Sequence, residues 1–440
     1  MSGWKFWTAT VLTGGLLAFS AATAQELSEL NTKAEKGDAG AQMSLGEMHV
    51  GGKGVPKDLA LAAKWFRKAA GQGHAEAQTQ LGNLYYNGQG VSQDNEEAAL
   101  WFAKAAKQGH AQAQTYLGSM HAAGKGLPRD MAAAIKWFRK AAEQGNHEAQ
   151  TQLGSILAQG KEVPRDYGAA AKWYLKAAKQ GNPHAQNNLG ALFEDGRGVA
   201  QNYEEAVKWY RKAADQGHAR AQINLGVIYE KGSGLPMDQL EAVRWYRKAA
   251  EQGHPEAQLY LGDIYAAGQG VPQDYAESMN WIHKAADQGN VDAQAALGNI
   301  YLKGTGAPQN YAVAVKWHRL AAEQGKAESQ LVLGRMYHDG KTVRQDNAES
   351  VKWYRKAAEQ GNVEAQFILG DMYRNGDGVP QVYVQAHKWL NLASGLGKGE
   401  PRKKATQGRD ELEKRMTREE IAEAQRLAND WFTRHAKKKK

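Results

Sequence analysis

Residues 74–109, HAEAQTQLGNLYYNGQGVSQDNEEAALWFAKAAKQG, contain two amphipathic segments on either side of a glycine-containing turn. In the first segment Ala77, Leu81 and Leu84 recur at the spacing of one helix face. The apolar pattern stops before Gly88. Because glycine tolerates the left-handed conformation that ends many helices, we expect the first helix to end at this residue.

The second segment has the features of another short helix. Asp94 is a good N-cap residue, and Glu97 three residues later completes a pair that resembles a capping box. Trp101 and Phe102 lie on its apolar face, and Gly109 follows its end. Neither helix of this hairpin can bury its apolar face alone, so the hairpin should stack against copies of itself.

Such copies are present, because a tryptophan recurs every 36 residues. These tryptophans are ten of the chain's 13 and stand at positions 65, 101, 137, 173, 209, 245, 281, 317, 353 and 389. A fixed period of this length is typical of solenoids. We therefore predict an all-α solenoid of about ten 36-residue helical hairpins over residues 38–397. A residue repeated at one place on the apolar face, Trp209 among them, is expected in the core and not in a ligand site.

The repeated pattern A-x-x-W-[YF]-x-K-A-A-x-Q-G-x-x-x-A-Q-x-x-L-G-x-x-Y-x-x-G-x-G-V-P-x-D resembles the Sel-one-like repeat family, a branch of the tetratricopeptide-like α-solenoids. The resemblance covers residues 38–397 and implies a right-handed solenoid whose first helices line a concave groove. Local departures are Glu162 and Thr342 for the second loop glycine, Ser329 for an alanine, Val382 for the capping Asp, and Ile282, His318 and Leu390 for the second aromatic.

The two ends of the chain differ from the repeats. Residues 25–37 predict an N-terminal capping helix, and residues 398–440 predict C-terminal capping helices and a basic tail. Residues 1–24 combine Lys5, an apolar run and a small-x-small ending at Ala24, which predicts a signal peptide and a periplasmic or secreted mature chain. An uncleaved anchor is the alternative, although the run is short for a membrane span.

Charge and cysteine content exclude several classes of function. The chain has no cysteine, which excludes disulfides and thiolate metal sites. Of the formal net charge of +9, most lies in residues 398–440, which hold 14 Lys and Arg against 8 Asp and Glu. The nearly balanced remainder does not favour specific nucleic-acid binding. Membrane contact is expected at most through an uncleaved leader or the tail Lys437–Lys440.

Comparison of the ten copies separates scaffold from surface. Positions equivalent to 77, 81, 82 and 84 barely change, whereas those equivalent to 79, 80, 83, 86 and 87 vary. With the groove that the resemblance implies, the varying positions predict a site for a protein or peptide ligand. Its expected residues are Asn83, Tyr86, Tyr116, Asn188, Asn224, Tyr260, Asp263, Asn299, Arg335 and Asp371.

We therefore expect an exported, non-catalytic scaffold that acts as an adaptor or regulator in envelope or host-interaction processes. The alternative is a peptidoglycan- or β-lactam-directed hydrolase, as described for cysteine-rich relatives. The one Ser-x-x-Lys, from Ser2 to Lys5, lies in the leader and so supplies no lactamase nucleophile. No cofactor or metal is expected, because the recurrent histidines at helix entry, such as His74 and His110, are explained by capping.

Removal of the leader is testable. We expect the mature protein from its native cell to begin at Gln25, since signal peptidases cleave after small-x-small sequences. Intact-mass spectrometry of the purified protein measures this directly. A mass that includes Met1 to Ala24, in protein recovered from membranes, would show an anchor instead.

Overall fold

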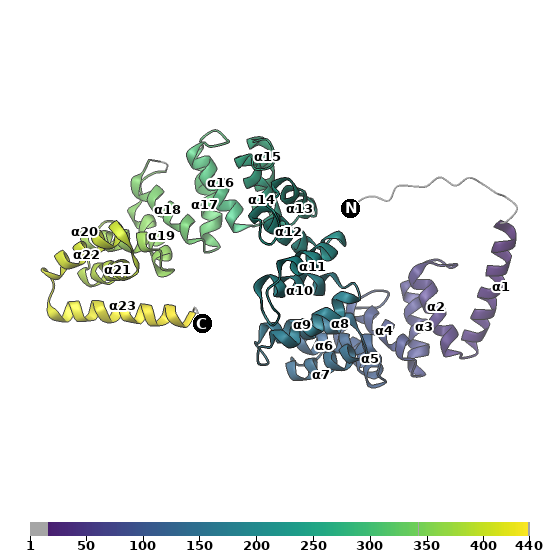
Figure 1. Ribbon diagram of the computed structural model, residues 1–440. Helices are drawn as coiled ribbons and strands as arrows, with labels where there is room; N and C mark the ends of the chain where they lie inside the picture. The colour runs from purple at the N-terminus through teal and green to yellow at the C-terminus, as the bar shows by residue number, and fades with distance from the viewer. Residues whose placement is uncertain (1–15, 342, 439–440) are drawn as a thin grey trace. The chain divides into compact units, whose positions relative to one another are not determined.

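The computed structural model describes residues 16–341 and 343–438, and every regular element in these ranges is an α-helix. The chain forms two compact units, Met1–Ala221 and Gln222–Lys440. In each unit, short helices follow one another in antiparallel pairs joined by tight loops (Figure 1). The predicted all-α solenoid of stacked hairpins is therefore confirmed.

The helices of the first unit are α1 (Leu16–Glu35), α2 (Ala39–Gly51), α3 (Leu59–Gly71), α4 (Ala75–Asn87), α5 (Asn95–Lys107), α6 (Ala111–Ala123), α7 (Met131–Glu143), α8 (His147–Gln159), α9 (Tyr167–Lys179), α10 (Pro183–Asp195) and α11 (Tyr203–Asp215). Helix α12 (Ala219–Lys231) contains the boundary. The second unit continues with α13 (Gln239–Glu251), α14 (Pro255–Ala267), α15 (Tyr275–Asp287), α16 (Val291–Lys303), α17 (Tyr311–Glu323), α18 (Ala327–Asp339), α19 (Asn347–Glu359), α20 (Val363–Asn375), α21 (Tyr383–Leu396), α22 (Gly399–Glu413) and α23 (Arg418–Lys438).

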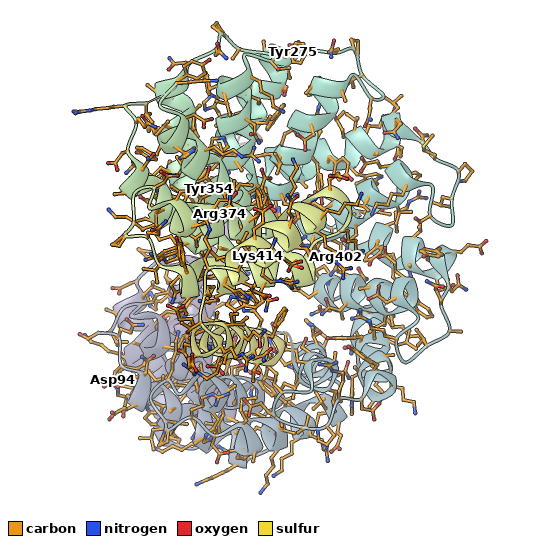
Figure 2. All side chains as sticks on the ribbon, turned by 90° about the vertical axis from the view of Figure 1, so that its left-hand side faces the viewer. Asp94, Tyr275, Tyr354, Arg374, Arg402 and Lys414 are labelled. Atoms are coloured by element: carbon orange, nitrogen blue, oxygen red, sulfur yellow. The ribbon has the colours of Figure 1, made fainter. Side chains whose placement is uncertain are left out.

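Local signals set the helix ends largely as the sequence indicates. Gly88 ends α4 with φ of 66°, in the left-handed region. Asp94, labelled in Figure 2, caps α5 by accepting hydrogen bonds from the backbone N–H groups of Glu96 and Glu97. The expected reciprocal bond of a capping box is not formed, because the N–H of Asp94 donates to the carbonyl of Tyr85 at 2.9 Å. The Glu97 carboxylate accepts a hydrogen bond from Trp101 Nε1 at 3.3 Å.

In most hairpins the second aromatic residue packs directly on a glycine of the first helix, and Ile282 and Leu390 take its place on Gly262 and Gly370. Tyr210 is only 1% exposed, and a Cβ added to Gly190 would lie 2.8 Å from its ring. In the second unit Tyr354, labelled in Figure 2, covers Gly334 in the same way. The glycine is therefore required for close approach of the two helices, and not for an unusual backbone angle.

The repeating tryptophan joins one hairpin to the next. Trp209 on α11 is buried in a cluster with residues of α9 and α10, among them Ala177 and Leu189. Its outer face is covered by Lys212, whose Nζ lies 4.5 Å from the ring centroid. The core position expected for Trp209 is confirmed.

A ladder of glutamines also links successive hairpins. Gln78 Nε2 donates to the carbonyl of Ala70 at 3.0 Å, and Gln108 Nε2 donates to Gln78 Oε1 at 2.8 Å. The same bond joins Gln252 to Gln222 at 2.8 Å in the second unit. Because an unpaired buried amide is costly, this ladder explains why the pattern keeps both glutamines.

The departures from the repeat pattern are accommodated individually. His318 takes the place of the second aromatic, is 1% exposed, and lies with its Nδ1 3.3 Å from Ser329 Oγ, itself a departure. Glu162 lies in a loop that still begins at Gly160 with φ of 64°. Thr342 lies outside the described residues.

The N-terminal end carries a cap, as predicted, but its helix is longer than residues 25–37. Helix α1 begins at Leu16, and Leu27 and Leu30 pack against the core around Leu45. Residues 1–15 of the predicted leader, with Ser2 and Lys5, lie outside the described residues. Among the described residues, no helix has the length and apolarity needed to span a membrane.

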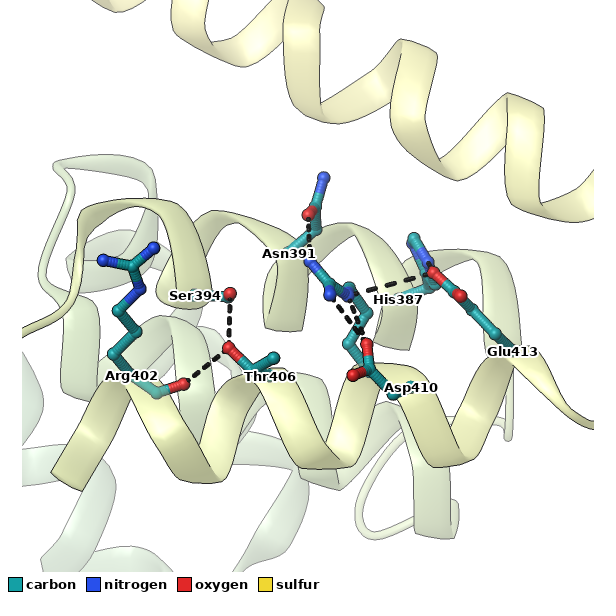
Figure 3. Close-up of polar contacts among 8 residues, drawn as sticks. His387, Asn391, Ser394, Arg402, Thr406, Asp410 and Glu413 are labelled. Carbon is teal, nitrogen blue, oxygen red and sulfur yellow. Dashed lines mark hydrogen bonds and ion pairs between the residues drawn. The ribbon is translucent and has the colours of Figure 1, made fainter.

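At the C-terminal end, α22 and α23 both pack on α21. Figure 3 shows the polar contacts between α21 and α22, in which His387 Nε2 lies 2.7 Å from Glu413 Oε1 and Ser394 Oγ lies 2.7 Å from Thr406 Oγ1. Helix α23 opens with a capping box in which the N–H of Thr417 donates to the Glu420 carboxylate. The tail residues Lys439 and Lys440 lie outside the described residues.

We expect Gly190→Ala to destabilise the first unit by about 1 to 3 kcal/mol, because the new methyl group overlaps the Tyr210 ring. Gly71→Ala is the matched control, since an added Cβ there meets no atom within 4 Å. Urea unfolding followed by circular dichroism measures both variants. An equal effect of the two substitutions would contradict the role of the ring contact.

We expect His318 to make the second unit acid-sensitive. Burial lowers the pKa of His318 from 6.5 to about 4, so the unfolded chain binds a proton that the folded one does not. The resulting stability is fully present above pH 6.5 and is lost as the pH falls towards 4, by up to about 3 kcal/mol. The double variant His318→Tyr with Ser329→Ala should remove this loss in urea unfolding at pH 7.0 and 4.5. If the free energy of unfolding still fell by the same amount between pH 7.0 and pH 4.5 in the double variant, His318 would not be the cause of the acid sensitivity.

Candidate binding trough

Two adjoining cavities lie on the first helices of the repeats in the first unit. One has a volume of about 290 Å³ and is lined by Asn83, Tyr86, Asn87, Phe102, Tyr116, Ser119, Met120 and Lys125. The other has a volume of about 450 Å³ and is lined by Thr115, Tyr116, Ser119, Glu148, Thr151, Gln152, Ser155, Asn182, His184 and Asn188. Since Tyr116 and Ser119 line both, we call the pair of cavities the trough.

The first cavity is amphiphilic. Phe102 and Met120, both buried, give it an apolar base, and the Phe102 ring lies 5.0 Å from that of Tyr116. Lys125 Nζ donates to the Tyr86 hydroxyl at 3.3 Å and lies 5.4 Å from the centre of its ring. The cavity therefore offers an apolar space with one cation at its side, a combination suited to an apolar or aromatic anchor.

Every side chain that lines the second cavity carries a polar group. The Ser155 hydroxyl donates to the carbonyl of Thr151 at 3.0 Å and accepts from the Tyr174 hydroxyl at 3.0 Å. Burial raises the pKa of Tyr174, which keeps this phenol protonated as the donor. Gln152 is exposed and Asn188 is half-buried, and each has an amide that both donates and accepts. These groups suit a ligand with many hydrogen-bonding atoms, such as a peptide backbone.

The structure brings four of the ten predicted site residues together. Asn83, Tyr86, Tyr116 and Asn188 all line the trough. In the second unit, Asn299 lines a separate cavity of about 240 Å³ whose walls include Tyr275 and Met279. The predicted residues that line these cavities therefore belong to two separate surfaces, the trough in the first unit and the cavity at Asn299 in the second.

The other five predicted residues line neither the trough nor the cavity at Asn299. Asn224 is half-buried and Asp263 is exposed. The ring of Tyr260 packs at a tilt against that of Tyr246, with ring centres 5.0 Å apart. Arg335 forms an ion pair with Glu364, and Asp371 forms one with Arg374 at 2.9 Å. For the two charged pairs, a ligand would have to replace an existing partner.

Asp371 lies close to a further cavity, of about 400 Å³, between α20 and α22. Arg374, labelled in Figure 2, lines it together with Glu411 and Arg415. Burial raises the pKa of Asp371, and the neighbouring Arg374 opposes this shift. Because both basic and acidic side chains line this cavity, its charge does not indicate one class of ligand.

Sequence reasoning missed Gln152, Ser119 and Ser155 in the trough. They stand at positions equivalent to 80 and 83, which vary among the copies. Aligning the repeats was therefore enough to identify them as candidates. The position equivalent to 79 behaves differently between copies, because Thr115 and Thr151 line the second cavity whereas Thr79 lines neither cavity of the trough. Thr79 is only 1% exposed, because its hydroxyl donates to the carbonyl of Ala75 at 2.9 Å and its side chain lies inside the stack.

Several residues at helix entry act as caps, as the sequence indicated, although His254 and Lys326 form no side-chain cap bond. His74 Nδ1 accepts a hydrogen bond from the N–H of Ala77 at 3.2 Å, and Asn146 Oδ1 accepts one from Ala149 at 2.9 Å. Across the described ranges there is no group of three or more His, Cys, Asp or Glu side chains arranged to hold a metal ion.

Comparison with known proteins places these features in a family. The Sel1 repeat model matches ten consecutive segments: 39–74, 75–110, 111–146, 147–182, 183–218, 219–254, 255–290, 291–326, 327–362 and 363–398. A search of curated proteins gave no match.

Two similar solved structures have bacterial sources. One is a protective antigen present in uropathogenic Escherichia coli strains that displays an SLR fold, with 36% identity, a TM-score of 0.59, and coverage of 92% of this chain and 94% of that one. The other is a Sel1 repeat protein from Oxalobacter formigenes, with 36% identity, a TM-score of 0.55, and coverage of 72% and 93%. The chain belongs to the Sel1 repeat family.

Proposed function

We propose that this protein is an exported, non-catalytic scaffold that binds an extended segment of another protein in the trough. Sel1 repeat and tetratricopeptide-like solenoids generally mediate protein interactions. The observation that carries the proposal is the pair of adjoining cavities, whose walls come largely from positions that vary among the repeats. In such a role the protein would serve as an adaptor or regulator of envelope or host-interaction processes.

The dimensions of the trough favour an extended peptide. It crosses α4, α6, α8 and α10, which are the first helices of four successive repeats. Packed helices lie roughly 10 Å apart. An extended chain advances about 3.3 Å per residue, so about three peptide residues would pass each repeat. An apolar side chain in the first cavity would fix the register, and the amides of Gln152 and Asn188 would pair with the peptide backbone.

The hydroxyl groups of the trough favour binding over hydrolysis. Ser119 and Ser155 both donate to backbone carbonyls four residues earlier, at 3.1 and 3.0 Å. A serine nucleophile instead needs its hydroxyl directed at a general base. Export is supported by a different observation, the leader-like start of the sequence. A role at the cell envelope or in host interaction is in line with the similar Escherichia coli protein, which is a protective antigen.

A photo-crosslinking experiment tests this function. We place p-benzoylphenylalanine at Gln152, exposed in the trough, or at Lys172, exposed on the second-helix side of the same unit. Crosslinks in living cells should form from Gln152 and be absent from Lys172. Adding Tyr86→Ala should lower the yield about tenfold, since an aromatic anchor contributes about 1 to 2 kcal/mol or more. Equal crosslinking from both positions, or a yield that does not depend on Tyr86, would contradict binding in the trough.

A further inference from the structure

The two kinds of helix in the first unit carry different charge. The first helices α2, α4, α6, α8 and α10 contain five acidic residues and no Lys or Arg. The second helices α3, α5, α7 and α9 contain eleven Lys and Arg and three acidic residues. Because the tryptophan of each second helix packs on the preceding hairpin, as Trp173 does on α7 and α8, these four helices form one layer. We call the outer side of this layer the basic face.

Three lysines on the basic face have no acidic partner. Lys64, Lys136 and Lys172 occupy the same repeat position in α3, α7 and α9, and all three are exposed. Within the ranges that the structure describes, none of them forms an ion pair. The residue three positions before each lysine is Leu61, Ala133 or Ala169. The charge of these lysines is therefore not compensated within their own helices.

Later repeats place a glutamate at that earlier position. Glu205 pairs with Lys208 at 2.9 Å, and Glu349 pairs with Lys352 at 2.9 Å. Such pairs stabilise a helix modestly, so local stability would favour them in every repeat. The second helices α13, α15, α17 and α19 of the second unit hold nine Lys and Arg against seven acidic residues. A large excess of basic side chains is thus a property of α3, α5, α7 and α9, and helix stability does not account for it.

A second row of lysines is held against the tryptophans. Lys68 Nζ lies 4.1 Å from the ring centroid of Trp65, and Lys176 Nζ lies 4.3 Å from that of Trp173. The ring attracts the ammonium group without neutralising it, so each contact keeps a positive charge on the basic face. The lysine also occupies the outer side of the ring, where a nucleic-acid base would otherwise stack.

The spread of these charges favours an extended anionic surface over a small anion. They lie on four helices of one layer, at intervals of roughly 10 Å. None of these basic side chains lines the cavities described above. Nine of the eleven are lysines, whose compact ammonium groups on flexible stems suit many exposed phosphates better than one bidentate contact. A bilayer with anionic headgroups is such a surface.

The position of the basic face along the chain also favours a membrane. It belongs to the repeats that follow the leader-like start, which is the segment expected to engage a membrane during export. The repeats of the second unit lie farther along the chain and are nearly balanced in charge on their second helices. Basic groups are therefore concentrated in the part of the chain that follows the leader-like segment.

We propose that the basic face of α3, α5, α7 and α9 binds the surface of a membrane that contains anionic lipid headgroups. This contact is separate from the trough, which is lined mainly by the first helices, so one molecule can hold a peptide while it lies on the membrane. Because lipid headgroups and not a protein contact this face, the proposal agrees with the absence of protein crosslinks expected from Lys172.

Vesicle sedimentation of the full-length protein tests the proposal. Vesicles of phosphatidylcholine with phosphatidylglycerol as a third of the lipid are compared with vesicles of phosphatidylcholine alone. At about 0.1 M salt, partitioning onto the anionic vesicles should be about tenfold stronger or more, and at about 1 M salt, where the Debye length is about 3 Å, this preference should disappear. Equal partitioning onto the two kinds of vesicle at low salt would overturn the proposal.

The matched variant is the triple substitution Leu61→Glu, Ala133→Glu and Ala169→Glu. It copies the native pair of Glu205 and Lys208 in three helices and keeps every lysine, so it should melt like the natural protein. Its partitioning onto the anionic vesicles should fall about tenfold or more, since each charge near an anionic surface contributes severalfold. Unchanged partitioning of this variant would overturn the proposal.

The control variant is Lys248→Gln with Lys284→Gln and Lys356→Gln. It changes the net charge by the same amount on exposed positions of the second helices of the second unit. It should bind the anionic vesicles like the natural protein. The leader and the C-terminal basic tail are common to both variants, so their contribution is the same. An equal loss in both variants would show attraction by net charge alone and would overturn the role of the basic face.

Two soluble polyanions distinguish other partners of a basic surface. Dextran sulfate represents an anionic polysaccharide, and double-stranded DNA represents a nucleic acid. Retention of the protein by either polymer, together with no preference for the anionic vesicles, would overturn the assignment to a membrane. Loss of the preference in the triple Glu variant, with its retention in the control, is the result that the proposal predicts.

Discussion

The contact between an aromatic ring and a glycine in the facing helix is the constraint on which the rest of this structure depends. Tyr210 on Gly190 and Tyr354 on Gly334 leave no room for a methyl group, so they fix how closely the two helices of a hairpin approach. With that distance set, Trp209 reaches the core of the preceding hairpin. The glutamine ladder then pairs the amides that stacking buries. Each hairpin is thus completed by its neighbour.

The difference between core positions and positions that line the trough explains where the repeats differ in sequence. An interior departure needs a local adjustment, as when His318 replaces an aromatic and Ser329 supplies a nearby hydroxyl. On the face of the first helices that lines the trough, side chains vary more freely, although Ser155 still accepts a hydrogen bond from Tyr174 on the facing helix. Positions there have diversified into tyrosines, amides and hydroxyls, and this diversity gives the trough its chemistry.

The trough combines two kinds of surface. The cavity between Tyr86 and Tyr116 is apolar at its base, where burial of an apolar ligand group would be favourable. The adjoining cavity is lined mainly by hydroxyl and amide groups, which favour correctly placed donors and acceptors. Because each hairpin contributes its own few varying positions, the apolar and the hydrogen-bonding character of the trough can differ from one repeat to the next.

The sequence by itself determined the hairpin, its period, the caps and the core position of Trp209, because each of these follows from residues within one 36-residue unit or its immediate neighbour. It also identified Asn83, Tyr86, Tyr116 and Asn188 as surface residues. Only the tertiary structure decided that these four share adjoining cavities, that Arg335 is paired with Glu364, and that Thr79 is buried. The reason is that cavities and ion pairs arise between side chains of different repeats, whose distances depend on the stacking of whole hairpins and not on local periodicity.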